Sequence, residues 1–388
     1  MTKQTLKHFA LSLAVLGLAL SASAGLGQSA PQQVAGTGWQ ALTDTSPAVA
    51  IGQGQTEYMA WKGASTNQVY FSVFNGSEWT PQQEVGGIGL QLGEPWSAET
   101  SAAPSLSWAP PFLWLSWQAS NGGAIMFSSW DGFGWSYPFE VSGTGWTAET
   151  SNPPAFDGLT QFPQLVAWKG ASSNSIWFSY TNPSPAAEGI GWTDQQTVGG
   201  SGWTAESNVA PALETTEGSL TPYLFWKGAS SDRIWESYTN KGASGWAQQT
   251  EISCEPQWAA ETNASPAAAA MGLGMVAPNW DVVVWKGSSD NTLWYTYDGN
   301  SGSSGLGCQW AHQRTVSGGR KGLFVGGPWS AETNVAPALA FSANFIGDVK
   351  SNPSVAILAW KNATDNTILF LNPTTLPGLA GLAQSLTP

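Results

Sequence analysis

A short phrase built on Trp, Lys and Gly recurs along the chain and constrains its fold more than any other feature. Its six copies stand 51 to 75 residues apart, a spacing typical of repeated supersecondary units. Each copy follows an apolar run such as SPAVAI and precedes a polar turn and an alternating aromatic segment such as VYFSVF. The tryptophans of the six copies are Trp61, Trp117, Trp168, Trp226, Trp285 and Trp360.

The repeat unit predicts strands and turns. Period-two alternation and aromatic enrichment indicate strands, and the Gly, Asn and Ser clusters between them indicate turns. A Trp-led segment such as WTPQQEV ends each unit, so each repeat predicts four short strands, and no stretch indicates a helix of useful length. The expected fold is therefore all-β, a six-bladed β-propeller of four-stranded antiparallel blades.

The two ends of the chain complement each other. The sixth repeat ends after its third strand, TILFLN, whereas the PQQV segment at Pro31 matches the fourth-strand segments TPQQEV and TDQQTV. We expect this N-terminal strand to complete the last blade and close the ring. An open solenoid, the rival architecture, would need capping units. The expected propeller spans residues 25–372 and precedes a C-terminal tail at 373–388.

Residues 1–24 have the pattern of a signal peptide. Lys3 and Lys7 form a basic start, an apolar run follows, and small residues precede a cleavage point after Ala24. The apolar run is too short for a transmembrane helix. The mature chain is therefore expected to be secreted, either extracellular or periplasmic.

Composition narrows the partners and the chemistry. Only 10% of residues are charged, 24 are Trp, and the net charge is −13, or −15 without the two signal lysines. This balance indicates a folded chain and argues against nucleic acid and against membrane insertion. Because the compartment is oxidising, Cys254 and Cys308 predict a disulfide.

A second repeated phrase, exemplified by GWTAESNVAPAL, contains a glutamate. In an antiparallel meander, the link between blades and the turn after the Trp-Lys-Gly phrase leave the same face, so we expect the glutamates and lysines to meet on one rim. Leu42 replaces the first glutamate and Gln118 the second lysine. The two sets are Glu99, Glu149, Glu206, Glu261 and Glu332, and Lys62, Lys169, Lys227, Lys286 and Lys361.

These residues have two interpretations. They are structural Glu–Lys pairs copied in each blade, or they form a ligand pocket copied about five times. A tryptophan stands three residues before each glutamate, and it either covers the apolar face of a sugar or seals the junction between blades. The tryptophans concerned are Trp96, Trp146, Trp203, Trp258 and Trp329, with Trp39 before Leu42.

Tryptophan-rich repeated blades on an exported chain resemble the β-propeller lectins, and are similar in style to the fungal fucose-binding and tectonin-type lectins. The resemblance implies a non-catalytic protein without a cofactor, and it implies glycans or glycoconjugates, fucose-type sugars among them, as partners. A structural or protein-interaction propeller without a sugar site is the alternative.

Catalysis has little support in the sequence. After the signal the only histidine is His312, there is no nucleophile elbow, and no Cys/His spacing predicts a metal site. Propeller sialidases resemble this architecture and use three arginines, whereas this chain has only Arg233, Arg314 and Arg320. A glycosidase is therefore the third hypothesis, which a non-repeated acidic cluster at the central channel would favour.

Overall fold

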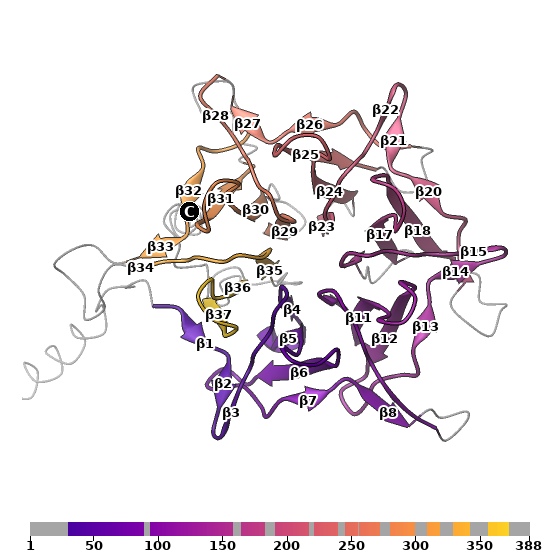
Figure 1. The fold of residues 1–388 in the computed structure, drawn as a ribbon, viewed down its shortest axis with the longest axis vertical. Coiled ribbons are helices and arrows are strands. Elements are labelled where there is room, and N and C mark those ends of the chain that lie inside the picture. The colour runs from indigo at the N-terminus through magenta and orange to yellow at the C-terminus, as the bar shows by residue number, and fades with distance from the viewer. Residues whose placement is uncertain are drawn as a thin grey trace, which may run out of the picture.

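The computed structural model describes residues 30–88, 94–157, 164–182, 191–216, 221–239, 245–254, 256–271, 280–298, 309–318, 329–341 and 356–371. It confirms the all-β propeller, with six blades arranged around a central channel (Figure 1). Within these residues the helical content is the three-residue 3-10 turn η1 (Gln53–Gln55). The predicted signal peptide at 1–24 and tail at 373–388 lie outside the described residues.

In each blade the strands follow one another antiparallel from the channel outward. The first three blades are β4 (Ala48–Ile51), β5 (Glu57–Lys62), β6 (Val69–Phe74) and β7 (Gln83–Glu84); β10 (Ser105–Ala109), β11 (Phe112–Gln118), β12 (Ile125–Trp130) and β13 (Phe139–Glu140); and β16 (Ala155–Asp157), β17 (Leu165–Lys169), β18 (Ile176–Asn182) and β20 (Gln196–Thr197), with β19 (Gly191–Trp192) also on β18.

The other three blades have the same order. They are β23 (Ala212–Thr216), β24 (Thr221–Lys227), β25 (Ile234–Tyr238) and β26 (Thr250–Glu251); β29 (Ala267–Met271), β30 (Trp280–Lys286), β31 (Leu293–Tyr297) and β32 (Arg314–Thr315); and β35 (Ala338–Phe341), β36 (Ala356–Lys361), β37 (Ile368–Leu371) and β1 (Gln32–Gln33).

The predicted ring closure is confirmed in the sixth blade. Strand β1 pairs with β37 in the register Gln32–Phe370 and Gln33–Leu369, and the backbone N–H of Val34 donates to Ile368 O at 2.9 Å. The N-terminal strand thus satisfies an edge that the last repeat leaves open. The closing strand is polar and two residues long, like the outer strands of the other blades, which limits pairing with a second molecule.

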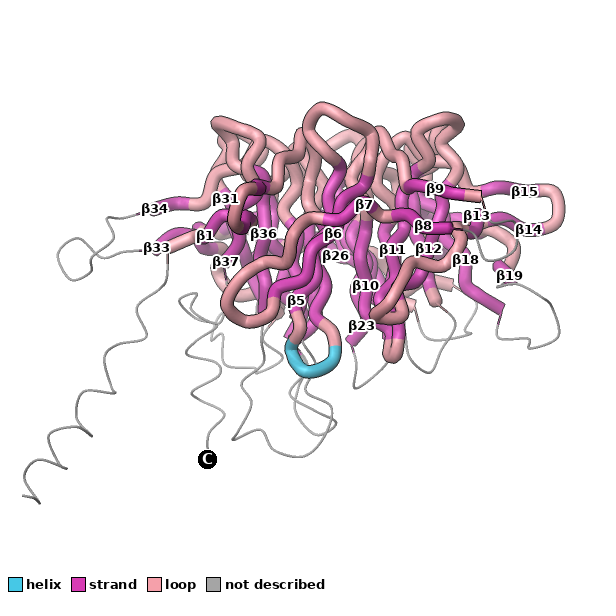
Figure 2. Tube along the Cα trace, turned by 90° about the horizontal axis from the view of Figure 1, so that it is seen from below, coloured by secondary structure: helices cyan, strands magenta, loops and turns pink. Residues whose placement is uncertain are grey.

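Short two-stranded ribbons project from the ring between consecutive blades (Figure 2), where the sequence predicted only links. Three of their turns follow a Gly-x-Gly-Trp pattern, and Gly38, Gly145 and Gly202 in these turns have φ values of 81° to 83°, which favour glycine. The six ribbons are β2 (Ala35–Gly36) with β3 (Trp39–Gln40), β8 (Gly86–Ile88) with β9 (Pro95–Ser97), β14 (Ser142–Gly143) with β15 (Trp146–Thr147), β21 (Gly199–Gly200) with β22 (Trp203–Thr204), β27 (Ser253–Cys254) with β28 (Trp258–Ala259), and β33 (Ser317–Gly318) with β34 (Trp329–Ser330).

The hydrophobic core lies between the blades. Among the described residues each of six apolar clusters is shared by two neighbouring blades. The tryptophans of the Trp-Lys-Gly phrase are at most 3% exposed, and each belongs to one of these clusters. These six tryptophans therefore fill the junctions between blades. Burying an indole at every junction ties each blade to its neighbour.

Two further features concern the chain as a whole. No helix within the described ranges has the length and apolarity to cross a bilayer. The described Cys254 is not a free thiol, whereas Cys308 lies outside the described residues, so the pairing of these two stays a prediction.

Candidate functional site: a repeated rim and an acidic blade junction

The glutamate phrase clamps each blade to the next through its backbone. In the link from the first to the second blade, Val69 N–H donates to Ala98 O at 2.9 Å, and Ser120 N–H donates to Glu99 O at 3.1 Å. Val69 belongs to the blade the chain leaves, and Ser120 to the turn after Trp117-Gln118-Ala119, the copy of the Trp-Lys-Gly phrase in the blade it enters. The two segments therefore meet on one rim, as the meander predicted.

The residue after each glutamate bends the chain into the innermost strand. The hydroxyl of Thr100 donates to Ala102 O at 3.0 Å and accepts from Ala102 N–H at 3.1 Å. These two local hydrogen bonds pair backbone groups that no neighbouring strand pairs in the turn. Buried hydroxyls make the same turn in the other links, from Thr43, Thr150, Ser207, Thr262 and Thr333.

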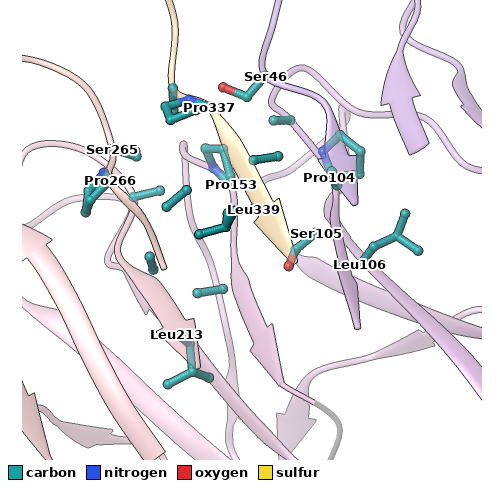
Figure 3. A pocket seen from close by; sticks show the side chains of 18 of the residues that line it. Ser46, Pro104, Ser105, Leu106, Pro153, Leu213, Ser265, Pro266, Pro337 and Leu339 are labelled. Carbon is teal, nitrogen blue, oxygen red and sulfur yellow. The ribbon is translucent and has the colours of Figure 1, made fainter. Parts of the chain in front are cut away.

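The end of the phrase forms the mouth of the central channel (Figure 3). Copies of an Ala/Ser-Pro-Ala segment from all six blades line a cavity of about 160 Å³, with Pro104, Pro266 and Pro337 among them. The wall is nearly six-fold, and its side chains are mostly Ala, Pro, Val and Leu, with the serine hydroxyls of Ser46, Ser105 and Ser265 among them. These positions are part of the scaffold that packs the six inner strands together.

The predicted meeting of the glutamate and lysine side chains is wrong. The lysines point inward: Lys62, Lys227, Lys286 and Lys361 are 4–6% exposed. Their ammonium groups bind the residue two positions after the glutamate. The contacts are Lys227 Nζ to Asn208 Oδ1 at 3.1 Å, Lys286 Nζ to Asn263 Oδ1 at 2.9 Å, Lys361 Nζ to Asn334 Oδ1 at 2.9 Å, and Lys62 Nζ to Asp44 Oδ1 at 2.9 Å.

The departures from the lysine pattern support this pairing. In the second blade Gln118 replaces the lysine, and its Oε1 accepts from Ser101, which occupies the asparagine position, at 2.7 Å. Each ammonium group also donates to the carbonyl of the next residue, as Lys62 does to Gly63 O at 3.1 Å. At half-buried Lys169 the equivalent residue is Ser151, and no hydrogen bond joins these two. The lysines are thus structural groups that fix the link, because a buried cation requires partners.

The tryptophans before the glutamates also pack on the core. The rings of Trp203 and Trp226 stack with centroids 6.2 Å apart and planes 4° apart, and the same stack joins Trp39 to Trp61, Trp96 to Trp117, and Trp146 to Trp168. A Cβ at Gly143 would lie 2.3 Å from Trp146 Nε1, so the indole also covers its own ribbon. Trp258 is buried, and Trp39, Trp96, Trp146, Trp203 and Trp329 are half-buried. The geometry favours the sealing role.

Close packing explains why a glycine follows the repeated lysine in most blades. A Cβ at Gly228 would lie 3.1 Å from Trp235 Nε1, because the third-strand indole lies over this glycine. The same holds for Gly63 under Tyr70, Gly170 under Trp177 and Gly287 under Trp294. In the two blades without an aromatic at that place, Met126 accompanies Ala119 and Leu369 accompanies Asn362. The aromatic ring, and not a ligand, therefore explains the glycine.

One repeated side chain has no such structural role. Glu99, Glu149, Glu206, Glu261 and Glu332 are all exposed, and none of the ion pairs between described residues joins them to a lysine. Glu261 alone has a charged partner, with Arg233 Nε 3.3 Å from its Oε1. Glu99 and Glu332 have only long contacts to serine hydroxyls, at 3.4 and 3.5 Å. Apart from Glu261, the rim glutamates therefore present carboxylates that no ion pair between described residues holds.

An acidic cluster lies between the fourth and fifth blades, outside the two repeated phrases. Glu214 on β23 pairs with Tyr223 on β24, and Phe225 pairs with Glu236 on β25, so these side chains share one face. That face packs on the fifth blade through Phe225 and Val283.

On the opposing face of the fifth blade, Asp281 stands two residues before Val283 on β30. Asp298 N–H donates to Asp281 O at 2.9 Å. Glu214, Glu236 and Asp281 are buried, Asp298 is half-buried, and Trp310 Nε1 donates to Glu236 Oε1 at 3.2 Å. The sequence analysis missed this cluster, although Glu236 stands where the other blades have Phe or Tyr.

Burial favours the protonated form of Glu214, Glu236 and Asp298. Desolvation raises the pKa of Glu236 to about 8, against the hydrogen bond from Trp310, which lowers it. Desolvation, then the charge of Asp281, raises the pKa of Glu214 well above its usual value. Desolvation likewise raises the pKa of Asp298. Carboxyl groups that remain protonated near neutral pH are candidates for general acids.

Metal chemistry has no candidate among the described side chains, where no three His, Cys, Asp or Glu residues gather as a metal site requires. His312 is exposed, and its ring lies 6.2 Å from that of Trp258. The contact is with an aromatic ring at the outer side of the fifth blade. It provides no base–nucleophile pair.

Comparison with known proteins identifies the fold. Neither a scan of family models nor a search of curated proteins found a match. Among solved structures, the chain is similar to the fucose-specific lectin from Aleuria aurantia, with TM-score 0.53 and 12% identity over 86% of this chain and 97% of the lectin. It is also similar to an intramolecular trans-sialidase from Ruminococcus gnavus, with TM-score 0.52 and 9% identity over 90% of this chain and 96% of that one.

The chain shares the propeller fold of lectins and of sialidases. A further similar structure is the Hadza microbial sialidase Hz136, with TM-score 0.53 and 10% identity over 84% of this chain. This chain spans 65% of the length of that sialidase. At these identities the likeness concerns the fold alone, so the site must decide the function.

Proposed function

We propose that the protein is an exported, non-catalytic carbohydrate-binding propeller with several equivalent weak sites on the glutamate rim. The observation that carries the proposal is the exposure of the repeated glutamates. The other repeated positions of the phrase are used by the fold, as the stacks of Trp203, the turn of Ser207 and the lysine contact of Asn208 illustrate. Glu206, Glu99, Glu149 and Glu332 are exposed and have no charged partner among the described residues, whereas Glu261 pairs with Arg233.

The burial of the lysines changes the expected contacts. Because Lys227 and its equivalents are held by protein groups, we assign them no ligand contact. At Glu332 a polar group next to the carboxylate comes from the adjoining ribbon, Ser330, and at Glu99 it comes from the turn of the following blade. In the second blade this is Ser120, whose Oγ lies 3.4 Å from Glu99 Oε2. A carboxylate flanked by hydroxyls suits the hydroxyl groups of a sugar, since charged acceptors form the stronger hydrogen bonds.

Weak binding is expected at each copy. The rim glutamates are exposed, so a single site buries little of a ligand and gains little free energy. Five copies on one rim compensate when a surface presents many sugars, because the second and later contacts form at high effective concentration. The partners proposed are therefore glycan-coated surfaces, with fucose-type glycans tested first.

A glycan array probed with the mature protein tests the proposal. We expect binding to a subset of glycans, which the triple variant Glu149→Gln, Glu206→Gln, Glu261→Gln loses. The control is the variant Glu78→Gln, Glu84→Gln, Glu140→Gln, which removes three exposed glutamates outside the phrase. Loss in both variants, or binding to no glycan on the array, would favour a protein-interaction propeller.

The acidic junction favours a second candidate function, glycoside hydrolysis. Glu214 belongs to an innermost strand, and Glu236 remains protonated up to about pH 8, as a general acid requires. Assay of the mature protein against chromogenic glycosides tests this candidate. Turnover that Glu236→Gln abolishes would support it, and the absence of turnover on all the glycosides tested would argue for the non-catalytic function.

A further inference from the structure

A cavity of about 240 Å³ lies at the seam where the N-terminal strand closes the ring. Gln32 on β1, together with Phe370 and Leu371 on β37, lines it from the sixth blade. Phe74 and Gly76 line it from the first blade, and so does Glu57, the first residue of β5. This cavity is separate from the glutamate rim and from the acidic junction of the fourth and fifth blades.

Glu57 is a buried carboxyl group without a polar partner among the described residues. The residue is 8% exposed, and no hydrogen bond or ion pair joins its carboxyl to another described residue. The strands packed around it, β1, β4, β6 and β37, contain no Asp, Glu, Lys, Arg or His. Burial alone raises the pKa of Glu57 to about 7. A carboxylate in such a place is costly unless a ligand compensates it.

The walls of the cavity add an aromatic component. Phe74 and Phe370 lie with ring centroids 5.7 Å apart at 63°, and both line the cavity together with Glu57. Benzene faces attract cations, and the attraction strengthens away from water. The amide of Gln32 supplies a polar group at the same cavity.

The seam is unlike the equivalent places in other blades. Glu57 stands five residues before Lys62, the repeated lysine of its blade. In the following blades the residues at the same place are Leu113, Gln164, Pro222, Asp281 and Ala356. Only the fifth blade has another carboxyl there, and Asp281 packs among other acids. The first blade alone combines one isolated carboxyl with two phenylalanine rings, so repetition of the scaffold does not account for this combination.

We propose that this cavity binds a small organic cation, an ammonium group carried on an apolar body. The carboxylate of Glu57 pairs with the ammonium group, and Phe74, Phe370 and Leu371 contact the apolar part. The net charge of the chain attracts cations to the protein. The site is distinct from the proposed sugar sites and does not depend on them.

Calorimetric titration of the full mature protein with benzylamine, and with benzyl alcohol as the uncharged match, tests this proposal. We expect benzylamine to bind at one site per chain and benzyl alcohol to bind at least tenfold more weakly. Between pH 6 and pH 8 the affinity for benzylamine should rise about tenfold, because only the ionised fraction of Glu57 binds the cation. This pH comparison uses the unaltered protein and needs no variant.

The variant Glu57→Gln keeps the shape and should weaken benzylamine binding at least tenfold, while Glu84→Gln, an exposed change in the same blade, leaves it unchanged. Far-UV circular dichroism establishes that both variants fold. Equal affinity for the amine and the alcohol, undiminished binding by Glu57→Gln, or no binding at millimolar benzylamine would each overturn the proposal.

Discussion

The ammonium nitrogen of Lys361 lies 2.9 Å from Oδ1 of Asn334, so the repeated lysine binds the residue two positions after the repeated glutamate. The pairing extends to Asp44 with Lys62 and to Ser101 with Gln118. The repeated glutamate phrase therefore contains residues with two different roles. The asparagine position holds the lysine in the interior, and the glutamate is left at the surface.

The first prediction follows from this separation. Replacing Asn208 by Ala removes one acceptor of Lys227, which keeps Gly228 O and Asp232 as partners. The free energy of unfolding should fall by about 1.5–3 kcal/mol, the usual contribution of a hydrogen bond to a charged group. Glu206→Gln, two residues earlier in the same link, should leave stability within about 0.5 kcal/mol, as exposed substitutions do. Urea denaturation measures both. A larger loss from Glu206→Gln than from Asn208→Ala would contradict the assignment.

Much of the fold could be predicted because repetition makes a weak signal visible several times. Six copies of the Trp-Lys-Gly phrase establish the strand order, and the PQQ segment at Pro31 identifies the closing strand without any three-dimensional information. The ribbons between blades were missed because strands of two or three residues have no hydrophobic period, although the Gly-x-Gly-Trp turns of three of them are visible in the sequence.

The site was harder to predict, because a repeated position does not reveal which way a side chain points. Lys286 and Glu261 are on the same rim, yet one is buried and the other exposed. The asparagine at 263 was the available signal, since it recurs at 208 and 334. Glu57 and Glu236 were missed for the opposite reason, because a search for repeated residues passes over those that occur once.

A second prediction concerns the glycine beneath the third-strand aromatic ring. Gly228→Ala places a Cβ 3.1 Å from Trp235 Nε1 and 2.7 Å from Ser231 Oγ, and should destabilise by about 1–3 kcal/mol. In the background of Trp235→Met, which imitates the second blade, the same change should cost clearly less. A double-mutant cycle of unfolding free energies measures this coupling. Equal costs in the two backgrounds would show that the ring does not explain the glycine.

Closure of the ring gives a third prediction. Deleting residues 31–34 removes β1 and the buried Val34, and leaves β37 with an open edge next to the core of the first blade. The shortened chain should melt at a lower temperature and associate through that edge. Scanning calorimetry and sedimentation would detect the two effects. A shortened chain that melts and sediments like the intact one would refute closure by this strand.

The acidic junction predicts how stability depends on pH. The pKa of Glu236 in the folded protein is raised to about 8, so the folded state binds more protons than the unfolded state above about pH 4.5. Stability therefore declines as the pH rises from about 4.5 to 8 and then levels off. Glu236→Gln keeps an acceptor for Trp310 and removes the charge, and should gain roughly 1–3 kcal/mol at pH 8.

Urea denaturation at pH 5 and pH 8 measures this difference, with Glu140→Gln as the exposed control. The gain of Glu236→Gln over the unaltered protein should be present at pH 8 and nearly absent at pH 5. A gain of equal size at both pH values would mean that ionisation of the junction is not its cause.

The exposed glutamates are the centre of this account, and a graded series of variants tests their role most directly. Binding to a glycan-coated surface and unfolding by urea are measured for Glu149→Gln, then with Glu206→Gln added, then with Glu261→Gln. If the glutamates bind glycans, retention on the surface should fall at each step and be lost with three changes. The free energy of unfolding should change by less than about 0.5 kcal/mol per step. Binding that survives all three changes, together with a steady loss of stability, would show that the glutamates belong to the scaffold.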